Sequence, residues 1–166
     1  LSAEKLKYQS LSDIDYLTGI YKRHGLFNQA EKTLSTVSDD LIWIQLNIDN
    51  FRQFNEIYGR YSSDQLLHDF GQVLKTKVRR DNLAAQLIDK ENSFRRGMAG
   101  HMGGGEFTVV LAHSSLPQAR LYAERLMRDF ESIRVKSKSG DDLTSSISIG
   151  VISASKTEDL DSIWLR

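Results

Sequence analysis

The segment LIWIQLNI, residues 41–48, constrains the fold of this chain more than any other stretch. Its even-numbered residues are all aliphatic, whereas the odd-numbered side chains become polar at Gln45 and Asn47. A two-residue period with β-branched side chains is typical of a strand. A strand with one fully aliphatic face needs cover, so we expect a sheet with helices packed over it.

Other segments predict the elements around this strand. Ser62 and Gln65 have the spacing of a capping box, which favours a helix start at that point. Apolar spacing predicts helices over 23–37, 62–80 and 116–133, and strands over 81–88, 107–111 and two runs either side of Gly140. The sum is an α+β fold with a central antiparallel sheet flanked by helices.

Composition excludes several classes of protein. The chain has 166 residues, equal numbers of acidic and basic residues and no cysteine, which suits one domain without disulfides or thiolate metal sites. Zero net charge gives no support for nucleic acid as a partner, although a local basic patch stays open. No apolar run approaches the roughly 18 residues of a membrane span. We expect a cytoplasmic domain whose parent protein is open to membrane attachment.

Polar residues follow two of the predicted strands. Asn47 and Asp49 stand at the end of strand 41–48, and Glu106 precedes strand 107–111 directly after Gly103–Gly105. If these strands are neighbours, all of these residues gather at one sheet edge. Glycine amides approach phosphate closely, and carboxylates beside them bind Mg²⁺. The pattern indicates a nucleotide site; the alternative is a flexible hairpin with a solvated Glu106.

The segment GGGEF, residues 103–107, resembles the signature of GGDEF domains, the diguanylate cyclase family that condenses two GTP into cyclic di-GMP. Three further segments resemble family motifs in the right order: DYLTGIYKR at 15–23, NIDNFRQFNEIYGRYSSD at 47–64 and SISIGV at 146–151. The resemblance implies a ferredoxin-like palm of the nucleotidyl cyclase type. On this reading residues 1–14 form a connector helix and residues 15–166 the GGDEF domain.

The resemblance implies a guanine site at Asn55 and Asp64, whose types match those of the family. The alternative places Asp64 in a first helical turn and Asn55 at a loop cap. Arg52 takes the place of a phosphate-contacting Lys and keeps its charge. Gly103, Gly104 and Gly105 would cradle the phosphates.

The metal site departs from the family. The Asp of the first strand corresponds to Asn47, and the first acidic residue of the turn corresponds to Gly105, so only Glu106 remains. Asp49 is a weak substitute, because its counterpart is not ordinarily a ligand. A charge pair about 4 Å apart is worth about 4 kcal/mol at an effective dielectric near 20, so losing two anions weakens Mg²⁺ binding by several kcal/mol. We expect the binding of Mg²⁺ to be weak or absent, and Glu106 is a doubtful catalytic group.

Four further departures concern the rest of the family pattern. The R-x-x-D of the product-inhibition site corresponds to Phe94 and Gly97, and His101 replaces the Arg that usually precedes the signature. Residues 86–100 are an apparent insertion, a loop or an extended hairpin. The chain ends before the family's C-terminal helix, whose Lys contacts phosphate.

Three functions follow from the sequence. The first is a degenerate GGDEF domain that binds GTP without turning it over, as a regulatory or interaction module beside sensor or EAL-type domains. The second is a working cyclase that recruits Asp49 and Glu106, and this version requires a homodimer in which each copy holds one GTP. The third is a scaffold that binds no nucleotide.

Overall fold

The structure is a computed structural model that describes residues 2–5, 13–36, 40–88 and 97–154. The strands are β1 Tyr21–Lys22, β2 Leu41–Ile48, β3 Gly97–Gly103, β4 Glu106–Leu111, β5 Val135–Lys136, β6 Asp142–Leu143 and β7 Ile147–Ala154. The helices are α2 Arg23–Leu34, α3 Phe51–Ile88 and α4 Leu116–Glu131.

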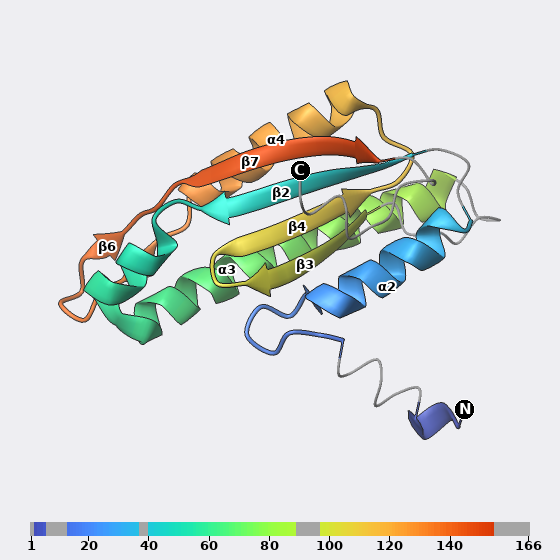
Figure 1. Cartoon of the computed structure of the whole chain (residues 1–166). Helices are drawn as coiled ribbons and strands as arrows, with labels where there is room; N and C mark the ends of the chain where they lie inside the picture. The colour runs from blue at the N-terminus through green and yellow to red at the C-terminus, as the bar shows by residue number, and fades with distance from the viewer. Residues whose placement is uncertain (1, 6–12, 37–39, 89–96, 155–166) are drawn as a thin grey trace.

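The main sheet has five strands in the order β1-β3-β4-β2-β7 (Figure 1). Neighbouring strands are antiparallel, except that β1 pairs with β3 in parallel. Strands β5 and β6 form a separate two-stranded sheet. This architecture confirms the predicted α+β palm.

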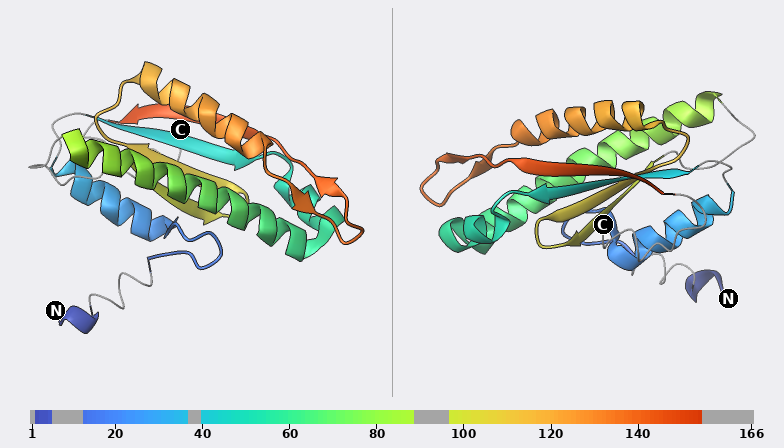
Figure 2. Two further views of the ribbon diagram at one scale, coloured as in Figure 1. Left: turned by 180° about the vertical axis from the view of Figure 1, so that it is seen from behind. Right: turned by 45° about the horizontal axis from the view of Figure 1, so that its top comes forward.

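Helices α3 and α4 cover one face of the sheet, and α2 covers part of the other (Figure 2). The aliphatic face of β2 packs toward α3 and α4, where Phe70 makes edge-on ring contacts with Phe107 and Phe130 at 4.8 and 4.9 Å between centroids. On the opposite face Trp43 is buried with Leu26 of α2. The two faces that the alternation of β2 predicts are both present.

Several expectations about element boundaries are wrong. Residues 81–88 continue α3 rather than forming a strand, because alanine, leucine and glutamine are strong helix formers. Ser62 does not cap a helix: it lies inside α3, and its hydroxyl donates to the carbonyl of Lys136 at 3.2 Å. The helix is instead interrupted at Gly59, whose φ of 84° is a left-handed conformation.

Two expectations fall largely outside the described residues. Of the predicted connector helix, residues 3–5 are helical and residues 6–12 are outside. Of the apparent insertion at 86–100, residues 86–88 belong to α3 and residues 97–100 to β3, whereas 89–96, with Phe94, are outside. In the part of the chain that is described, none of the helices is long and apolar enough to cross a membrane.

Candidate functional site

The ends of β2 and β4 bring the predicted polar residues together. Asn47 on β2 lies directly opposite Glu106 on β4, and its partner on the other side is Ser148 of β7. Directly opposed residues of an antiparallel pair have Cβ atoms about 4.5–5.5 Å apart. A row of serine, amide and carboxylate therefore crosses the sheet beside the β3–β4 turn; the sequence predicts Asn47 and Glu106 in it but not Ser148.

The glycine turn connects β3 to β4. Gly103 and Gly104 have φ values of 114° and 52°, a region that favours glycine. A Cβ at either position would meet no atom within 4 Å, so these two glycines are required by backbone conformation rather than by space. They leave an exposed backbone of the kind that can approach a phosphate.

Gly105 is required for the opposite reason. It is buried, and its carbonyl accepts a hydrogen bond from the backbone N–H of Ile48 at 2.9 Å. A Cβ at this position would lie 2.8 Å from the Cβ of Phe51 and 3.2 Å from the Cβ of Ile48. The position where the family carries an acidic side chain is here closed by packing.

Asp49, which follows β2, is held by two serines at and just before the start of β7. Its carboxylate accepts hydrogen bonds from the hydroxyls of Ser146 and Ser148, at 2.6 and 2.5 Å. The Ser146 hydrogen bond, then that of Ser148, holds the pKa of Asp49 below its ordinary value. Its oxygens are already committed to these two hydroxyls.

The guanine candidates Asn55 and Asp64 and the phosphate candidate Arg52 lie on α3, which starts at the same end of the sheet as the glycine turn (Figure 1). Asn55 precedes the break at Gly59 and is exposed, and Asp64 follows it and is half-buried. Arg60 lies 3.8 Å from the Asp64 carboxylate. Arg52 is exposed and pairs with Glu56 at 3.3 Å.

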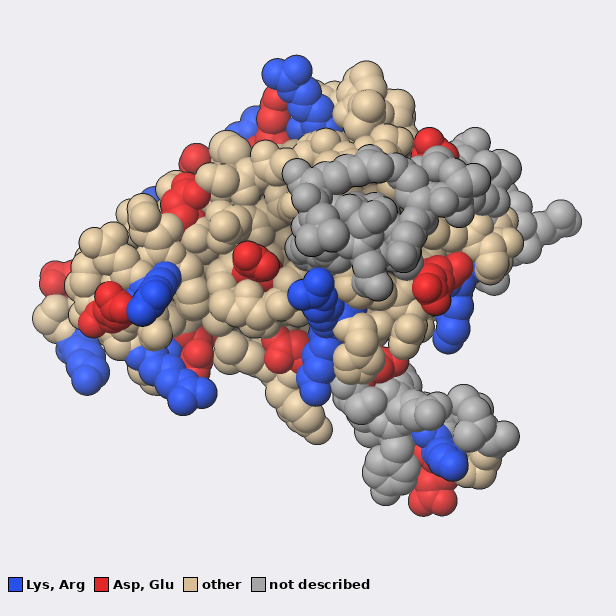
Figure 3. All heavy atoms as spheres, in the orientation of Figure 1, with Lys and Arg blue, Asp and Glu red and all other residues tan. Residues whose placement is uncertain are grey.

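A hollow of about 600 Å³ opens on the same face of the sheet as α2, over the part that this helix leaves uncovered. Asn47 and Glu106 line it, together with Gln45, Ser148 and Arg23. Arg23, at the start of α2, was missed as a site residue, although it is the last letter of the motif-like segment 15–23. Figure 3 shows acidic and basic side chains interspersed on this face, in keeping with one arginine and one glutamate in the hollow.

Metal-ligating side chains are sparse at this site. Within the described ranges, no three His, Cys, Asp or Glu side chains are grouped closely enough to hold a metal ion. Asn47 supplies a neutral amide and Gly105 supplies no side chain. Of the carboxylates, Glu106 lies in the row with Asn47, and Asp49 is bound by serines.

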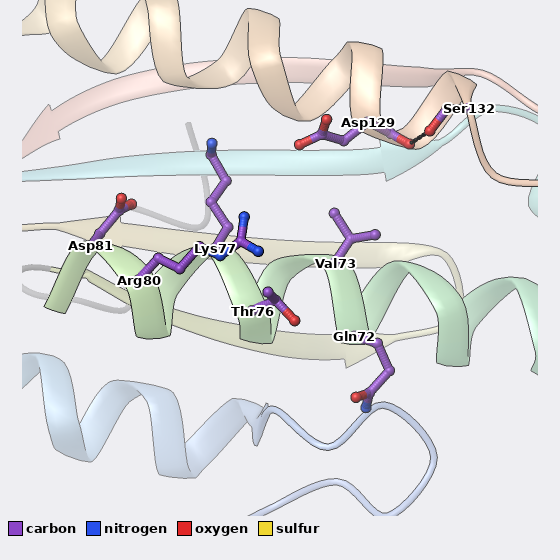
Figure 4. A pocket seen from close by; sticks show the side chains of 8 residues that line it. All are labelled: Gln72, Val73, Thr76, Lys77, Arg80, Asp81, Asp129 and Ser132. Atoms are coloured by element: carbon purple, nitrogen blue, oxygen red, sulfur yellow. Dashed lines mark hydrogen bonds between the residues drawn. The ribbon is translucent and has the colours of Figure 1, made fainter. Parts of the chain in front are cut away.

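A second hollow of about 460 Å³ lies on the far side of the sheet, between α3 and α4 (Figure 4). Lys77 and Arg80 face it, as do the carboxylates of Asp81 and Asp129. The Lys77 ammonium also lies 4.7 Å from the centre of the Tyr122 ring. Its charges are balanced, and none of the predicted site residues contributes to it.

The five-stranded sheet with its flanking helices has the palm architecture of nucleotidyl cyclases. The family model described as "Diguanylate cyclase, GGDEF domain" matches residues 12–165. The chain therefore belongs to the GGDEF domain family, whose members occur in cyclic di-GMP signalling proteins.

Curated relatives support this membership. YhcK of Bacillus subtilis, an uncharacterized protein, is 30% identical over 149 residues, which cover 87% of this chain and 37% of YhcK. The diguanylate cyclase VdcA of Vibrio cholerae is 28% identical, with coverage of 98% and 44%. SH2145 of Staphylococcus haemolyticus, an uncharacterized membrane protein, is 28% identical, with coverage of 87% and 37%. The chain thus spans less than half the length of these relatives.

Solved structures show the same fold at low sequence identity. The diguanylate cyclase SiaD of Pseudomonas aeruginosa, in complex with its activator SiaC, gives a TM-score of 0.79 at 20% identity, covering 98% of this chain and 58% of that one. The S helix-GGDEF-EAL portion of Vibrio cholerae LapD, bound to c-di-GMP, gives 0.70 at 14%, covering 97% and 33%.

Proposed function

We propose that this chain is a GTP-binding regulatory or interaction module with impaired cyclase activity. The observation that carries the proposal is the row at the strand ends, where the amide of Asn47 lies opposite Glu106 and Gly105 is packed against Phe51. Phosphoryl transfer depends on electrostatic stabilisation of the reacting phosphate and its nucleophile. A row with one free carboxylate supplies little of the negative charge that two Mg²⁺ ions require.

The GTP-binding half of the proposal rests on groups that remain. Asn55 and Asp64 keep the residue types that read guanine in the family, and the Asp64 carboxylate can accept from the guanine N1–H and 2-amino groups. The exposed backbone of Gly103 and Gly104 is open to phosphate. Arg23 lines the hollow and adds a positive charge there. This charge can attract the phosphates of a nucleotide that is bound with little Mg²⁺. We therefore expect weak or absent Mg²⁺ and nucleotide binding that does not depend on it.

Two assays test the proposal. Calorimetric titration of GTP, with and without Mg²⁺, is expected to show binding in both conditions. Chromatography of the products after incubation with GTP and Mg²⁺ or Mn²⁺ is expected to show no cyclic di-GMP. Accumulation of cyclic di-GMP that Glu106→Ala abolishes would instead establish an active cyclase, and absence of any GTP binding would establish a scaffold.

Variants of the guanine site test how GTP is recognised. Asp64→Ala is expected to weaken GTP binding by about 10- to 100-fold, since a hydrogen bond to a charged group is worth about 1.5–3 kcal/mol. Asn55→Ala is expected to weaken it by about 2- to 10-fold, since a hydrogen bond between neutral groups is worth about 0.5–1.5 kcal/mol. Inosine triphosphate, which lacks the 2-amino group, should bind wild type less tightly than GTP, and Asp64→Ala should remove that preference. Gln53→Ala, an exposed amide on the same helix, is the matched control. Unchanged affinity in both alanine variants would refute the guanine site.

The setting of the module is part of the proposal. LapD joins a GGDEF to an EAL segment, and SiaD binds an activator protein. We infer by analogy that neighbouring sensor or EAL-type domains receive the nucleotide signal here, within a cytoplasmic or membrane-attached parent. A homodimer is required only if the chain is an active cyclase.

A further inference from the structure

A third hollow, of about 420 Å³, lies where the second half of α3 passes the edge of the sheet at β1 and β3. Its walls come from the loop before β1, from β1, from α3 and from the first residues of β3. The continuation of α3 through 81–88 supplies part of the helical wall. Small-molecule sites in proteins have volumes of about 300–1,000 Å³, so the hollow is large enough to hold a ligand. None of the residues of the candidate nucleotide site lines it.

The walls of this third hollow are mainly apolar. Its apolar lining side chains are Ile14, Ile20, Tyr21, Val78, Leu83 and Met98. Ile20 and Met98 are buried, whereas 53% of Leu83 is exposed. A ligand with an apolar body would cover the exposed part of Leu83 and remove apolar surface from water, which favours binding.

Asn82 closes the wall between α3 and β3. Its amide Nδ2 donates to the carbonyl oxygen of Gly97 at 3.1 Å, and its Oδ1 accepts from the backbone N–H of Gly97 at 2.9 Å. The short strand β1 pairs with β3 further along, at Gly100 and His101. The side chain of Asn82 thus takes the place of a strand partner at the start of β3, and its amide oxygen is committed to that role.

Two exposed cations line the same hollow. Lys75 and Arg79 are four residues apart on α3, a spacing that places them on one side of the helix. The ammonium of Lys75 lies 3.6 Å from the position that a Cβ on Gly19 would occupy, so this side chain leans over the loop before β1. Among the described residues, no Asp or Glu lines this hollow or forms an ion pair with either cation. In contrast to the hollow between α3 and α4, its charge is not balanced.

We propose that this third hollow binds a small amphipathic carboxylate, a molecule with an apolar body and one acidic head group. The apolar body packs against the walls around Leu83 and Met98, and the head group lies between Lys75 and Arg79. A guanidinium presents parallel N–H donors that match the two oxygens of a carboxylate, and an ammonium adds a point charge. A cationic ligand is repelled by both side chains, and a neutral one gains the apolar contact alone.

Nuclear magnetic resonance of the chain with ¹³C-labelled methionine methyl groups tests the site directly. The probe is decanoate, an unbranched apolar chain with one carboxylate, kept below the concentration at which it forms micelles. The methyl signal of Met98 should shift and saturate, whereas that of Met127, which lies on α4 and packs against the core, should stay constant. Decanol should bind more weakly than decanoate, and decyltrimethylammonium should leave the Met98 signal unchanged.

Matched pairs of variants on α3 test the two parts of the site. Arg79→Ala should weaken decanoate binding by about two- to fivefold, the range for exposed ion pairs. Arg80→Ala removes the same charge from a residue that lines the hollow between α3 and α4, and it should leave the affinity unchanged. Leu83→Glu removes an apolar contact and adds a like charge, so it should weaken binding by about tenfold. Leu87→Glu is its control, because Leu87 is 78% exposed and does not line the hollow.

Three results would overturn the proposal: a Met98 signal that decanoate does not shift, equal binding of decanoate and decyltrimethylammonium, or equal effects of the two arginine variants. If Leu83→Glu does not fold, the arginine pair still decides, since both of these side chains are exposed. None of the measurements uses GTP, so failure of this site and failure of the proposed function are distinguishable.

Discussion

Substitution of Gly105 by alanine should destabilise the domain although it adds only one methyl group. The new Cβ would lie 2.8 Å and 3.0 Å from the Cβ and Cγ of Phe51, and 3.2 Å from the Cβ of Ile48. Carbon atoms in contact prefer about 3.5–4.0 Å. The Cβ atoms of Phe51 and Ile48 are bonded directly to the backbone, so a rotamer change cannot move them aside.

The expected magnitude follows from other overpacked sites. Extra methyl groups forced into close-packed regions cost about 1–3 kcal/mol. For a domain of this size, 1 kcal/mol lowers Tm by about 2–4 °C. Gly105→Ala should therefore lower Tm by about 2–12 °C, measured by calorimetry and by urea unfolding.

A matched control and a double-mutant cycle make the reasoning refutable. Gly150 lies on β7 and lines the hollow that contains Asn47 and Glu106. A Cβ at Gly150 would meet no atom within 4 Å, so Gly150→Ala should leave stability unchanged or slightly raised. Phe51→Gly removes both close atoms of that residue, and its combination with Gly105→Ala should cost less than the sum of the single changes. A Gly105→Ala variant as stable as wild type would refute the packing role.

Two further predictions concern the carboxylates. Asn47→Asp, an isosteric change at an exposed position opposite Glu106, should give a Tm that rises with millimolar Mg²⁺ while wild type does not respond; equal responses in both would contradict our reading of the row. Ser146→Ala should raise the pKa of Asp49 toward its ordinary value of 3.8, observable by ¹³C titration of the carboxyl. A carboxylate whose pKa is lowered in the folded state stabilises the fold at pH values above its ordinary pKa, and this stabilisation is lost as the pH falls through the pKa of the folded state. Ser146→Ala should therefore cost more stability at pH 7 than at pH 2.5. Equal costs would show that the hydrogen bond from Ser146 does not contribute to stability.

The sequence predicted the central part of the fold because its signals there are local and redundant. Strand 41–48 is observed over the predicted residues, since alternation and β-branching both favour it. The pairing of this strand with 107–111 also holds, and it brings Asn47 opposite Glu106. The prediction of a strand over 81–88 is wrong, because these residues continue α3. The apolar pattern suggested a buried strand there, whereas Leu83 is exposed on the helix.

The parts of the site that the sequence could not predict depend on contacts between distant segments. The closure of Gly105 requires Phe51 and Ile48 to be known in space. The contacts of His101 with Asp15 and with the carbonyl oxygen of Gly104 require Asp15, 86 residues earlier, to lie beside the turn. Neither contact follows from spacing along the chain, because each is set by how the loop before β1 and the start of α3 pack against the end of the sheet.

These contacts also help to hold the shape of the turn. The backbone N–H of Ile48 holds the carbonyl of Gly105, and His101 holds that of Gly104. Phe51 fills the space that a side chain at position 105 would need. A carboxylate introduced at position 105 would disturb this packing. If Mg²⁺ binding is weak, as we propose, a substitution that strengthens it should therefore begin at Asn47, where the side chain is exposed and has room to change.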